Sequence, residues 1–338
     1  MSTENQPSGP ARESRRSGPL VRTVRWMENL GETGFAYFLL TPVFLVLGTI
    51  ALYPLLRTFE LSLYTNVLIE AEFVGLENYV KLLTGEANAD LPGTTTFLPD
   101  SVSTSGRFPF VHVEGLLRSA LVVTLLFTVV SVFFETIIGF GQALVLDQDF
   151  HGRRWVRAAI IIPWAIPIVI QGMIFYLMFD PTAGFLTEYL GPLGIIAQEN
   201  TLNDPLSSLL IITVADIWKT TAFMALLILA GLQSIDRNLY EVARVAGASR
   251  WQQFKMITLP LVLPALGIAV LFRTIDAMRV YGLIDSVSGC STVPSLSCMV
   301  VMTFNSNRGL AAAIAFVTAA IIGLLVTVVI YQQYKEGI

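Results

Sequence analysis

The sequence predicts an all-α integral membrane protein with six transmembrane helices. Of its 338 residues, 54% are hydrophobic and only 14% are charged, whereas a soluble domain has about 25% charged residues. The mean hydropathy is +0.66. Six apolar runs reach the length of about 20 residues that a bilayer requires, and they cover 34–56, 117–146, 157–179, 206–232, 261–283 and 309–331. Short alternating segments typical of a membrane β-barrel are not seen, so these runs are expected to be helices.

The chain before and after the first run divides into a tail and a membrane domain. Residues 1–30 are polar and predict a disordered cytoplasmic tail. The run 34–56 is longer than the core of a signal peptide and lacks a clear cleavage site, so we expect it to be retained. Residues 31–338 then form the transmembrane domain, whose outer loop at 57–116 has a short helix at Glu77-Asn78-Tyr79 and a flexible stretch at 93–106. The second run is so long that it should tilt or extend past the lipid.

Basic residues set the expected orientation in the membrane. They precede the first run (Arg12, Arg15, Arg16, Arg22, Arg25), separate the second from the third (Arg153, Arg154, Arg157), and occur between the fourth and fifth (Arg237, Arg244, Arg250, Lys255). The loop 180–205 has acidic residues and no lysine or arginine. Because cytoplasmic loops carry the excess of lysine and arginine, we expect both termini in the cytoplasm of a multi-pass protein of the plasma or inner membrane.

A polar insert at 233–260 separates the fourth run from the fifth and is expected to face the cytoplasm. Asp236 is a suitable N-cap for a helix over 237–246, and Gly247 occupies the position of a left-handed residue that ends a helix. Ser249 and Gln252 fit a capping box for a second helix, which would run to about residue 258 before Pro260 and Pro264. A well-capped charged segment of this kind indicates a docking surface for another protein, although an amphipathic helix on the membrane surface is the alternative.

The insert resembles the cytoplasmic coupling loop of importer-type ABC transporter permeases. The resemblance lies in Glu241-x-Ala243-x-x-x-Gly247, and the residues between 240 and 264 are most similar to the sugar-uptake subfamily. Val242 stands where a second alanine is usual, and Ala246 where an aspartate often precedes the glycine, but both keep the helix. The residues that the resemblance assigns to coupling are Glu241, Ala243, Gly247, Ala248, Ile257, Leu259 and Pro260.

Further motifs extend this resemblance over about residues 34 to 331, among them Pro163-Trp164-Ala165-Ile166-Pro167 and Trp218-Lys219-Thr220-Thr221. It implies an importer-type permease bundle that passes a sugar, of the trehalose or maltose kind, from an extracellular binding protein to the cytoplasm. It also implies as partners a second permease in a heterodimer, two ABC ATPase subunits, the extracytoplasmic solute-binding protein and membrane lipid, but no nucleic acid. Two alternatives are a permease for another solute, such as glycerol phosphate, and a secondary transporter that works without an ATPase.

The chain lacks the motifs of an ATP-hydrolysing enzyme. It has no G-x-x-x-x-G-K-[ST] loop, no H-E-x-x-H and no Cys-x-x-Cys cluster, and its two histidines, His112 and His151, lie in separate loops. We therefore expect a non-catalytic subunit without a cofactor or metal of its own, whose partner ATPase binds ATP and Mg²⁺.

Charged residues within the apolar runs are candidates for function because they are costly in a bilayer. Glu135 lies in the second run, and the others lie in or beside the fourth and fifth. The expected substrate path combines these charges with neighbouring polar and aromatic residues: Asp216, Trp218, Lys219, Thr220, Phe223, Arg273, Asp276, Arg279 and Tyr281. Asp216 and Lys219 share a face of the fourth run, and Asp276 lies near two arginines. These charges either only brace the bundle or bind sugar hydroxyls while the aromatic rings stack on the sugar.

Two cysteines, Cys290 and Cys298, fall in the outer loop expected at 281–308. Outside the cytoplasm they could oxidise and close a small loop. The sequence leaves open whether they form a disulfide or remain free thiols.

Overall fold

The computed structural model describes residues 31–65, 71–99 and 113–335, and in these ranges the regular elements are helices, with two isolated β-bridges. The expected tail at 1–30 lies outside the described residues, as does the second half, 100–106, of the stretch expected to be flexible at 93–106. The helices before the first long span of the bundle are α2 (Glu32–Leu47), η1 (Gly48–Leu52), α3 (Tyr53–Ser62), α4 (Glu77–Thr84), η2 (Glu86–Ala89) and α5 (Val113–Leu117). The short helix predicted at Glu77 is thereby confirmed as α4.

The remaining helices follow in chain order. They are α6 (Ala120–Asp147), α7 (Arg153–Ala165), α8 (Ile168–Met178), α9 (Phe185–Leu190), α10 (Pro205–Gln233), α11 (Arg237–Val245), α12 (Arg250–Gln253), η3 (Phe254–Thr258), α13 (Leu259–Ala277), α14 (Gly282–Val287), α15 (Leu296–Phe304) and α16 (Arg308–Lys335). The chain divides into two compact units at Thr58, so α2, η1 and most of α3 are separate from the bundle that follows.

Five of the predicted spans are long apolar helices, at Glu32–Ser62, Ala120–Asp147, Pro205–Gln233, Arg250–Ala277 and Arg308–Tyr331. The third, expected over 157–179, is instead a pair of helices, α7 and α8, that meet at an angle of 92°. Ile166 adopts an extended conformation at the break, with ψ of 130°, and Pro167 follows it. A residue before proline is pushed out of the helical region, which explains why the apolar run does not continue as one helix.

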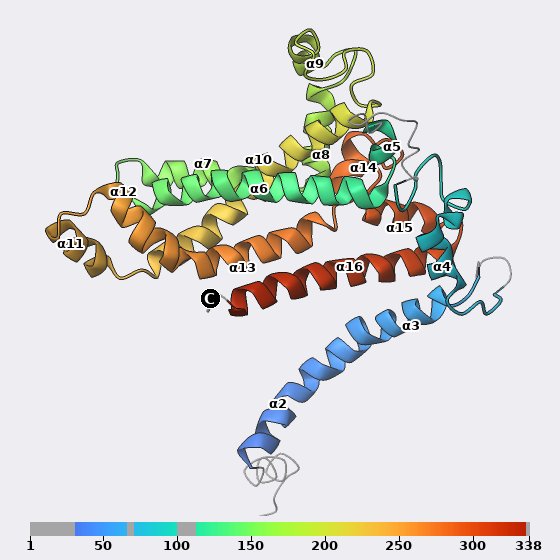
Figure 1. Ribbon diagram of the computed structural model, residues 1–338, viewed down its shortest axis with the longest axis horizontal. Coiled ribbons are helices and arrows are strands. Elements are labelled where there is room, and N and C mark those ends of the chain that lie inside the picture. The colour runs from blue at the N-terminus through green and yellow to red at the C-terminus, as the bar shows by residue number, and fades with distance from the viewer. Residues whose placement is uncertain (1–30, 66–70, 100–112, 336–338) are drawn as a thin grey trace, which may run out of the picture. The chain divides into compact units, whose positions relative to one another are not determined.

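The core of the second unit is α10, which packs along α6 and also contacts α13 and α7 (Figure 1). Its close approach to α6 depends on Gly139, where an added Cβ would lie 2.8 Å from the Cβ of Met224. Small residues at such crossings allow membrane helices to pack closely, since packing rather than the hydrophobic effect drives their association. The α6–α10–α13 contact is therefore the frame on which the polar side chains of the bundle are placed.

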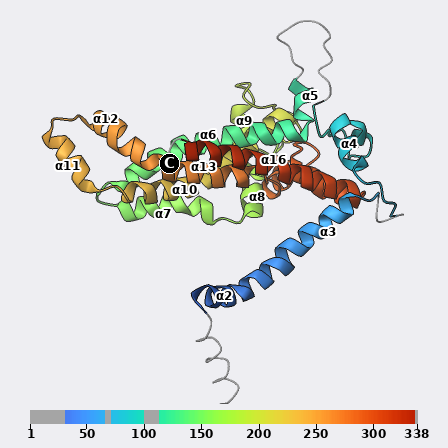
Figure 2. The ribbon, with the colours of Figure 1, turned by 60° about the horizontal axis from the view of Figure 1, so that its bottom comes forward.

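The polar insert and α4 lie at opposite ends of the bundle. Figures 1 and 2 show α11 beyond one end of α6 and α10, α4 beyond the other, and the C-terminal end of α16 directed toward the α11 end.

The second helix of the insert does not end near residue 258 as predicted, because α12, η3 and α13 form one continuous helix over Arg250–Ala277. The π-helical turn Phe254–Thr258 directly precedes Pro260, and such a turn is a local adjustment that re-pairs backbone groups freed by a proline.

The segment 281–308, expected to be an outer loop, contains two helices that belong to the core. Leu283, Ile284 and Val287 of α14 pack with α8 and α10, and Leu296 and Met299 of α15 pack with α16. Cys290 and Cys298 lie between and within these helices and are joined by a disulfide, with their Cα atoms 5.5 Å apart and both side chains buried.

Candidate functional site

The insert at 233–260, which we call the predicted coupling segment, is built by local backbone capping, much as its sequence predicts. The Asp236 side chain accepts from the Asn238 amide at 2.9 Å at the start of α11, and Ser249 forms a capping box with Gln252 at the start of α12. Gly247 has a φ of +83°. The Gly247 amide donates to the Arg244 carbonyl at 3.1 Å and the Ala248 amide to the Ala243 carbonyl at 2.9 Å. This is the Schellman pattern, so Ala243, Gly247 and Ala248 together end α11.

Five exposed apolar side chains lie along α11 and the helix that follows it. Together we call them the docking face; they are Leu239, Val242, Val245, Trp251 and Met256. Val245 is 91% exposed, although apolar residues on a short, well-capped helix normally face a core. Large exposed apolar patches mark sites of interaction with another protein or with a membrane. The docking face thus presents the chemistry of an interaction surface at the end of the bundle.

Two contacts fasten α11 to the membrane helices. Arg237 donates to Asp147, the last residue of α6, at 2.6 Å, and Tyr240 and Thr258 share a hydrogen bond of 3.0 Å between their hydroxyls. The bond to Asp147 raises the pKa of the Arg237 guanidinium. These contacts connect α11 to α6 and to the long helix that contains α13.

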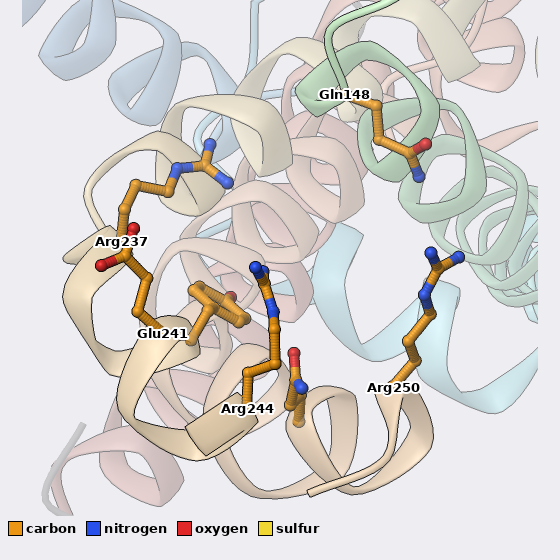
Figure 3. Close-up of a pocket in the computed structure, with 7 residues that line it drawn as sticks. Gln148, Arg237, Glu241, Arg244 and Arg250 are labelled. Atoms are coloured by element: carbon orange, nitrogen blue, oxygen red, sulfur yellow. The ribbon is translucent and has the colours of Figure 1, made fainter. Parts of the chain in front are cut away.

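Between α11, α12 and the end of α6 lies a polar cavity of about 480 Å³. Its lining residues are Gln148, Arg237, Tyr240, Glu241, Arg244, Arg250 and Gln253. In Figure 3, the guanidinium groups of Arg244 and Arg250 point into the space below Gln148. Of the other predicted coupling residues, Ile257 packs against the core cluster beneath α11, Leu259 is half-buried and Pro260 is exposed. Ile257 thus packs the start of the long helix against the apolar core of the bundle.

A buried ionic cluster joins α6, α10 and α13 inside the bundle. Arg273, which is 2% exposed, donates through Nε to Glu135 Oε2 at 2.5 Å and through Nη2 to Glu135 Oε1 at 3.0 Å. The same Nη2 also donates to Asp216 Oδ2, and Nη1 donates to Asp276 Oδ2 at 3.0 Å. Thr220 adds a hydrogen bond to Glu135 Oε1 at 2.5 Å. Arg273 of α13 is thus bonded to a carboxylate on α6 and to another on α10.

The ion pair suggested by the spacing of Asp216 and Lys219 does not form. Asp216 points into the bundle and pairs with Arg273, which lies 57 residues further along the chain, whereas Lys219 is half-buried and has no ion pair among the described residues. The planar guanidinium fork can serve several carboxylates at once, which an ammonium group does less well. Arg279 lies beyond the end of α13, is exposed and forms no ion pair within the described chain.

Beside the cluster is a cavity of about 300 Å³, here called the central cavity. Its lining residues are Trp164, Thr220, Phe223, Phe272, Arg273 and Asp276. Four of them belong to the substrate path expected from the sequence. Trp218 instead contacts Phe175, with 5.9 Å between ring centroids, and Tyr281 packs against the core. The break between α7 and α8 leaves Trp164 at the end of α7, where its ring stacks on Phe223 at 6.3 Å.

Three contributors to the ionic cluster and the central cavity, Glu135, Trp164 and Phe272, were not among the predicted site residues. Glu135 was visible as a charge in the second run, and Trp164 stood within the Pro163-to-Pro167 motif, but neither signal showed where the side chain points. Phe272 had no signal, because a phenylalanine in an apolar run is ordinarily a lipid- or core-facing residue.

Comparison with known proteins gives consistent results. Residues 135–335 match the family described as binding-protein-dependent transport system inner membrane component. The trehalose/maltose transport system permease protein MalF of Thermococcus litoralis is 34% identical over 86% of this chain and 90% of its own length. The trehalose transport system permease protein SugA of Mycobacterium tuberculosis is 31% identical over 78% of this chain and 75% of its own.

The fold is also that of a solved transporter. A chain of a bacterial ABC transporter involved in the import of the acidic polysaccharide alginate has a TM-score of 0.70, with 20% sequence identity, and the match covers 92% of this chain and 99% of that chain.

Proposed function

Because this chain belongs to the family of binding-protein-dependent transport system inner membrane components, we propose that it is the membrane-spanning subunit of an ATP-driven sugar importer. Its substrate is a disaccharide of the trehalose or maltose type, as the names of its relatives suggest. The observation that carries the proposal is the docking face, which is exposed, apolar and fastened to α6 and α13. It offers a partner a point of attachment to α13, which lines the central cavity, and to α6, whose Glu135 is bonded to Arg273.

The proposed partners follow from the energy source. A second permease, forming a heterodimer with this one, would complete the path, and two ABC ATPase subunits would bind ATP and Mg²⁺ and dock on the coupling segment. An extracytoplasmic solute-binding protein would deliver the sugar at the opposite end. This arrangement requires α11 and both termini to face the cytoplasm, in agreement with the basic residues Arg237, Arg244 and Arg250 at that end.

The mechanism is alternating access between two states of the bundle. When the ATPases close, α11 moves with them, and the Asp147–Arg237 and Tyr240–Thr258 contacts pass the displacement to α6 and α13. Because Arg273 of α13 lines the central cavity and is bonded to Glu135 of α6, the same displacement changes the walls of that cavity. The permease then converts a rigid-body movement at one end into a change of access in the middle.

Uptake and co-purification test this proposal together. Cells that carry the intact transporter should accumulate radiolabelled trehalose or maltose, and a deletion of this chain should abolish the accumulation. An affinity-tagged version should retain an ABC ATPase during purification. Uptake that persists without any ATPase subunit would instead indicate a secondary transporter.

A further inference from the structure

We propose that the central cavity selects neutral, hydroxyl-rich solutes and rejects sugars that carry a carboxylate, sulfonate or phosphate, with Asp276 as the residue that determines this selectivity. The inference rests on the proposed function, since it names the chemical class of sugar that the path accepts. Three properties of the cavity support the inference. The guanidinium of Arg273 is already bonded to carboxylates, the charges around the cavity do not favour an anion, and the groups that remain free to bind suit a sugar.

The guanidinium of Arg273 is not available to an anion. Arginine has five N–H donors, and four hydrogen bonds already run from Arg273 to the carboxylates of Glu135, Asp216 and Asp276. Anionic groups are usually held by arginine through two parallel bonds. Here an incoming anion would have to displace a carboxylate, and only one N–H, on Nη1, remains to meet a ligand.

The charges around the central cavity do not favour an anion either. Three carboxylates, those of Glu135, Asp216 and Asp276, face Arg273, and Lys219 is the one other cation that interacts electrostatically with them among the described residues. The three acids outnumber the two bases by one, which leaves a net negative charge on this group of residues. Because interactions between charges are stronger inside a protein than in water, this balance opposes a second negative charge.

The groups that remain free suit a sugar. The Asp276 side chain is 76% exposed, and its Oδ1 accepts no hydrogen bond within the described part of the chain, so it can accept from hydroxyl groups. Trp164 and Phe223 stack with an interplanar angle of 24°, and the Phe272 ring is exposed beside them. Apolar walls with a few placed polar groups are typical of a small-molecule site. An aromatic surface next to a carboxylate acceptor fits the apolar face and the hydroxyl donors of a neutral sugar.

Asp276 can be substituted without removing the contacts by which the ionic cluster joins α6 and α10 to α13. Glu135 and Asp216 are buried and hold α6 and α10 to Arg273, so their removal would disturb the bundle. Asp276 is exposed and pairs with Arg273 only three residues away on the same helix. A change of Asp276 to asparagine keeps the shape of the side chain and removes its charge, so the bundle should fold.

The test is direct binding to the purified transporter complex, reconstituted in lipid nanodiscs without the solute-binding protein. Trehalose and trehalose 6-phosphate are compared by equilibrium dialysis with radiolabelled ligand. Asp276→Asn is measured beside a matched control, Asp285→Asn, which removes another exposed aspartate from a position outside the cavity. The uptake of neutral sugar by the same variants is recorded separately.

We expect the wild-type complex to bind trehalose at least about tenfold more tightly than the phosphate, from the repulsion between charges a few ångströms apart. Asp276→Asn should narrow this ratio by at least about threefold, and Asp285→Asn should leave it unchanged. Equal binding of the two sugars by the wild type overturns the proposal. So does a ratio that Asp276→Asn leaves unchanged, because size rather than charge would then exclude the phosphate.

The same measurements separate this proposal from the proposed function. If trehalose uptake is intact and neither sugar binds the complex, the central cavity is not the site and the inference fails alone. If no sugar is taken up in the presence of the complete transporter, the proposed function itself fails. Tight binding of trehalose 6-phosphate would instead support the alternative that the protein is a permease for phosphorylated solutes such as glycerol phosphate.

Discussion

Replacing Gly247 by valine should uncouple the transporter without unfolding it. Gly247 has a φ of +83°, and an added Cβ would meet no atom within 4 Å. The substitution therefore creates no clash with a neighbour, and its cost comes from the backbone alone. The two bonds that end α11, from the Gly247 and Ala248 amides, exist only while this residue stays in the left-handed region.

The size of the effect follows from that conformation. For an L-residue with a side chain, the left-handed conformation costs about 1–2 kcal/mol. The cost for a β-branched residue such as valine lies at the upper end of this range. A loss of that size shifts a local equilibrium by a factor of roughly 5 to 30. The turn between α11 and α12 would then leave its capped conformation in much of the population, and the docking face would lose its shape.

The assays are co-purification of the ATPase subunit, sugar uptake and thermal unfolding of the permease. Gly247→Val should reduce the first two by roughly 5- to 30-fold, while the midpoint of unfolding stays close to the wild-type value because no core contact changes. Gly194→Val is the matched control: its φ is +71°, a Cβ there is also free of neighbours, and it lies in the loop between α9 and α10. That variant should retain the ATPase. Normal ATPase association and uptake in Gly247→Val would refute the assignment of this segment to docking.

Further predictions concern the bundle and the disulfide. Arg273→Met should reduce the free energy of unfolding by about 3–5 kcal/mol, because it leaves two buried carboxylates without their partner; folded yield by size-exclusion chromatography measures this, and a normal yield would contradict a bracing role. Lys219→Met should change stability by less than about 0.5 kcal/mol, since no described residue pairs with it, and a large loss of stability in thermal unfolding would contradict this. A membrane-impermeant thiol reagent should label neither Cys290 nor Cys298 in intact cells before reduction, because they are bonded and buried. After reduction, labelling should occur from the outside; labelling that requires permeabilised cells would overturn the orientation.

Local features could be predicted from the sequence because they depend on neighbours in the chain. The N-cap at Asp236, the left-handed Gly247 and the capping box at Ser249 each involve residues within a few positions, and the structure confirms all three. Five apolar runs could be identified as helices of membrane-spanning length for the same reason. The break at Pro167 also had a local signal, but hydropathy alone extended the run across it.

The end of the second coupling helix and the segment 281–308 were predicted wrongly for a shared reason. Prolines at 260 and 264 indicate the end of a helix, yet α12, η3 and α13 continue through them. Residues 281–308 do not form an apolar run of membrane-spanning length, yet they fold as two helices that pack into the core. In both cases packing against the bundle outweighs the local preference of the chain.

The sequence by itself determined the class of this protein, the number of apolar runs and the capping of its coupling segment, since these follow from composition and short-range bonds. Only the tertiary structure decided which charges meet. Glu135 and Arg273 lie 138 residues apart, and Arg273 rather than Lys219 binds Asp216, because the packing of α10 between α6 and α13 brings these side chains to one point. The periodicity of one helix shows which face a charge occupies, but the partner on that face comes from another helix, whose rotation and depth are set by contacts across the bundle.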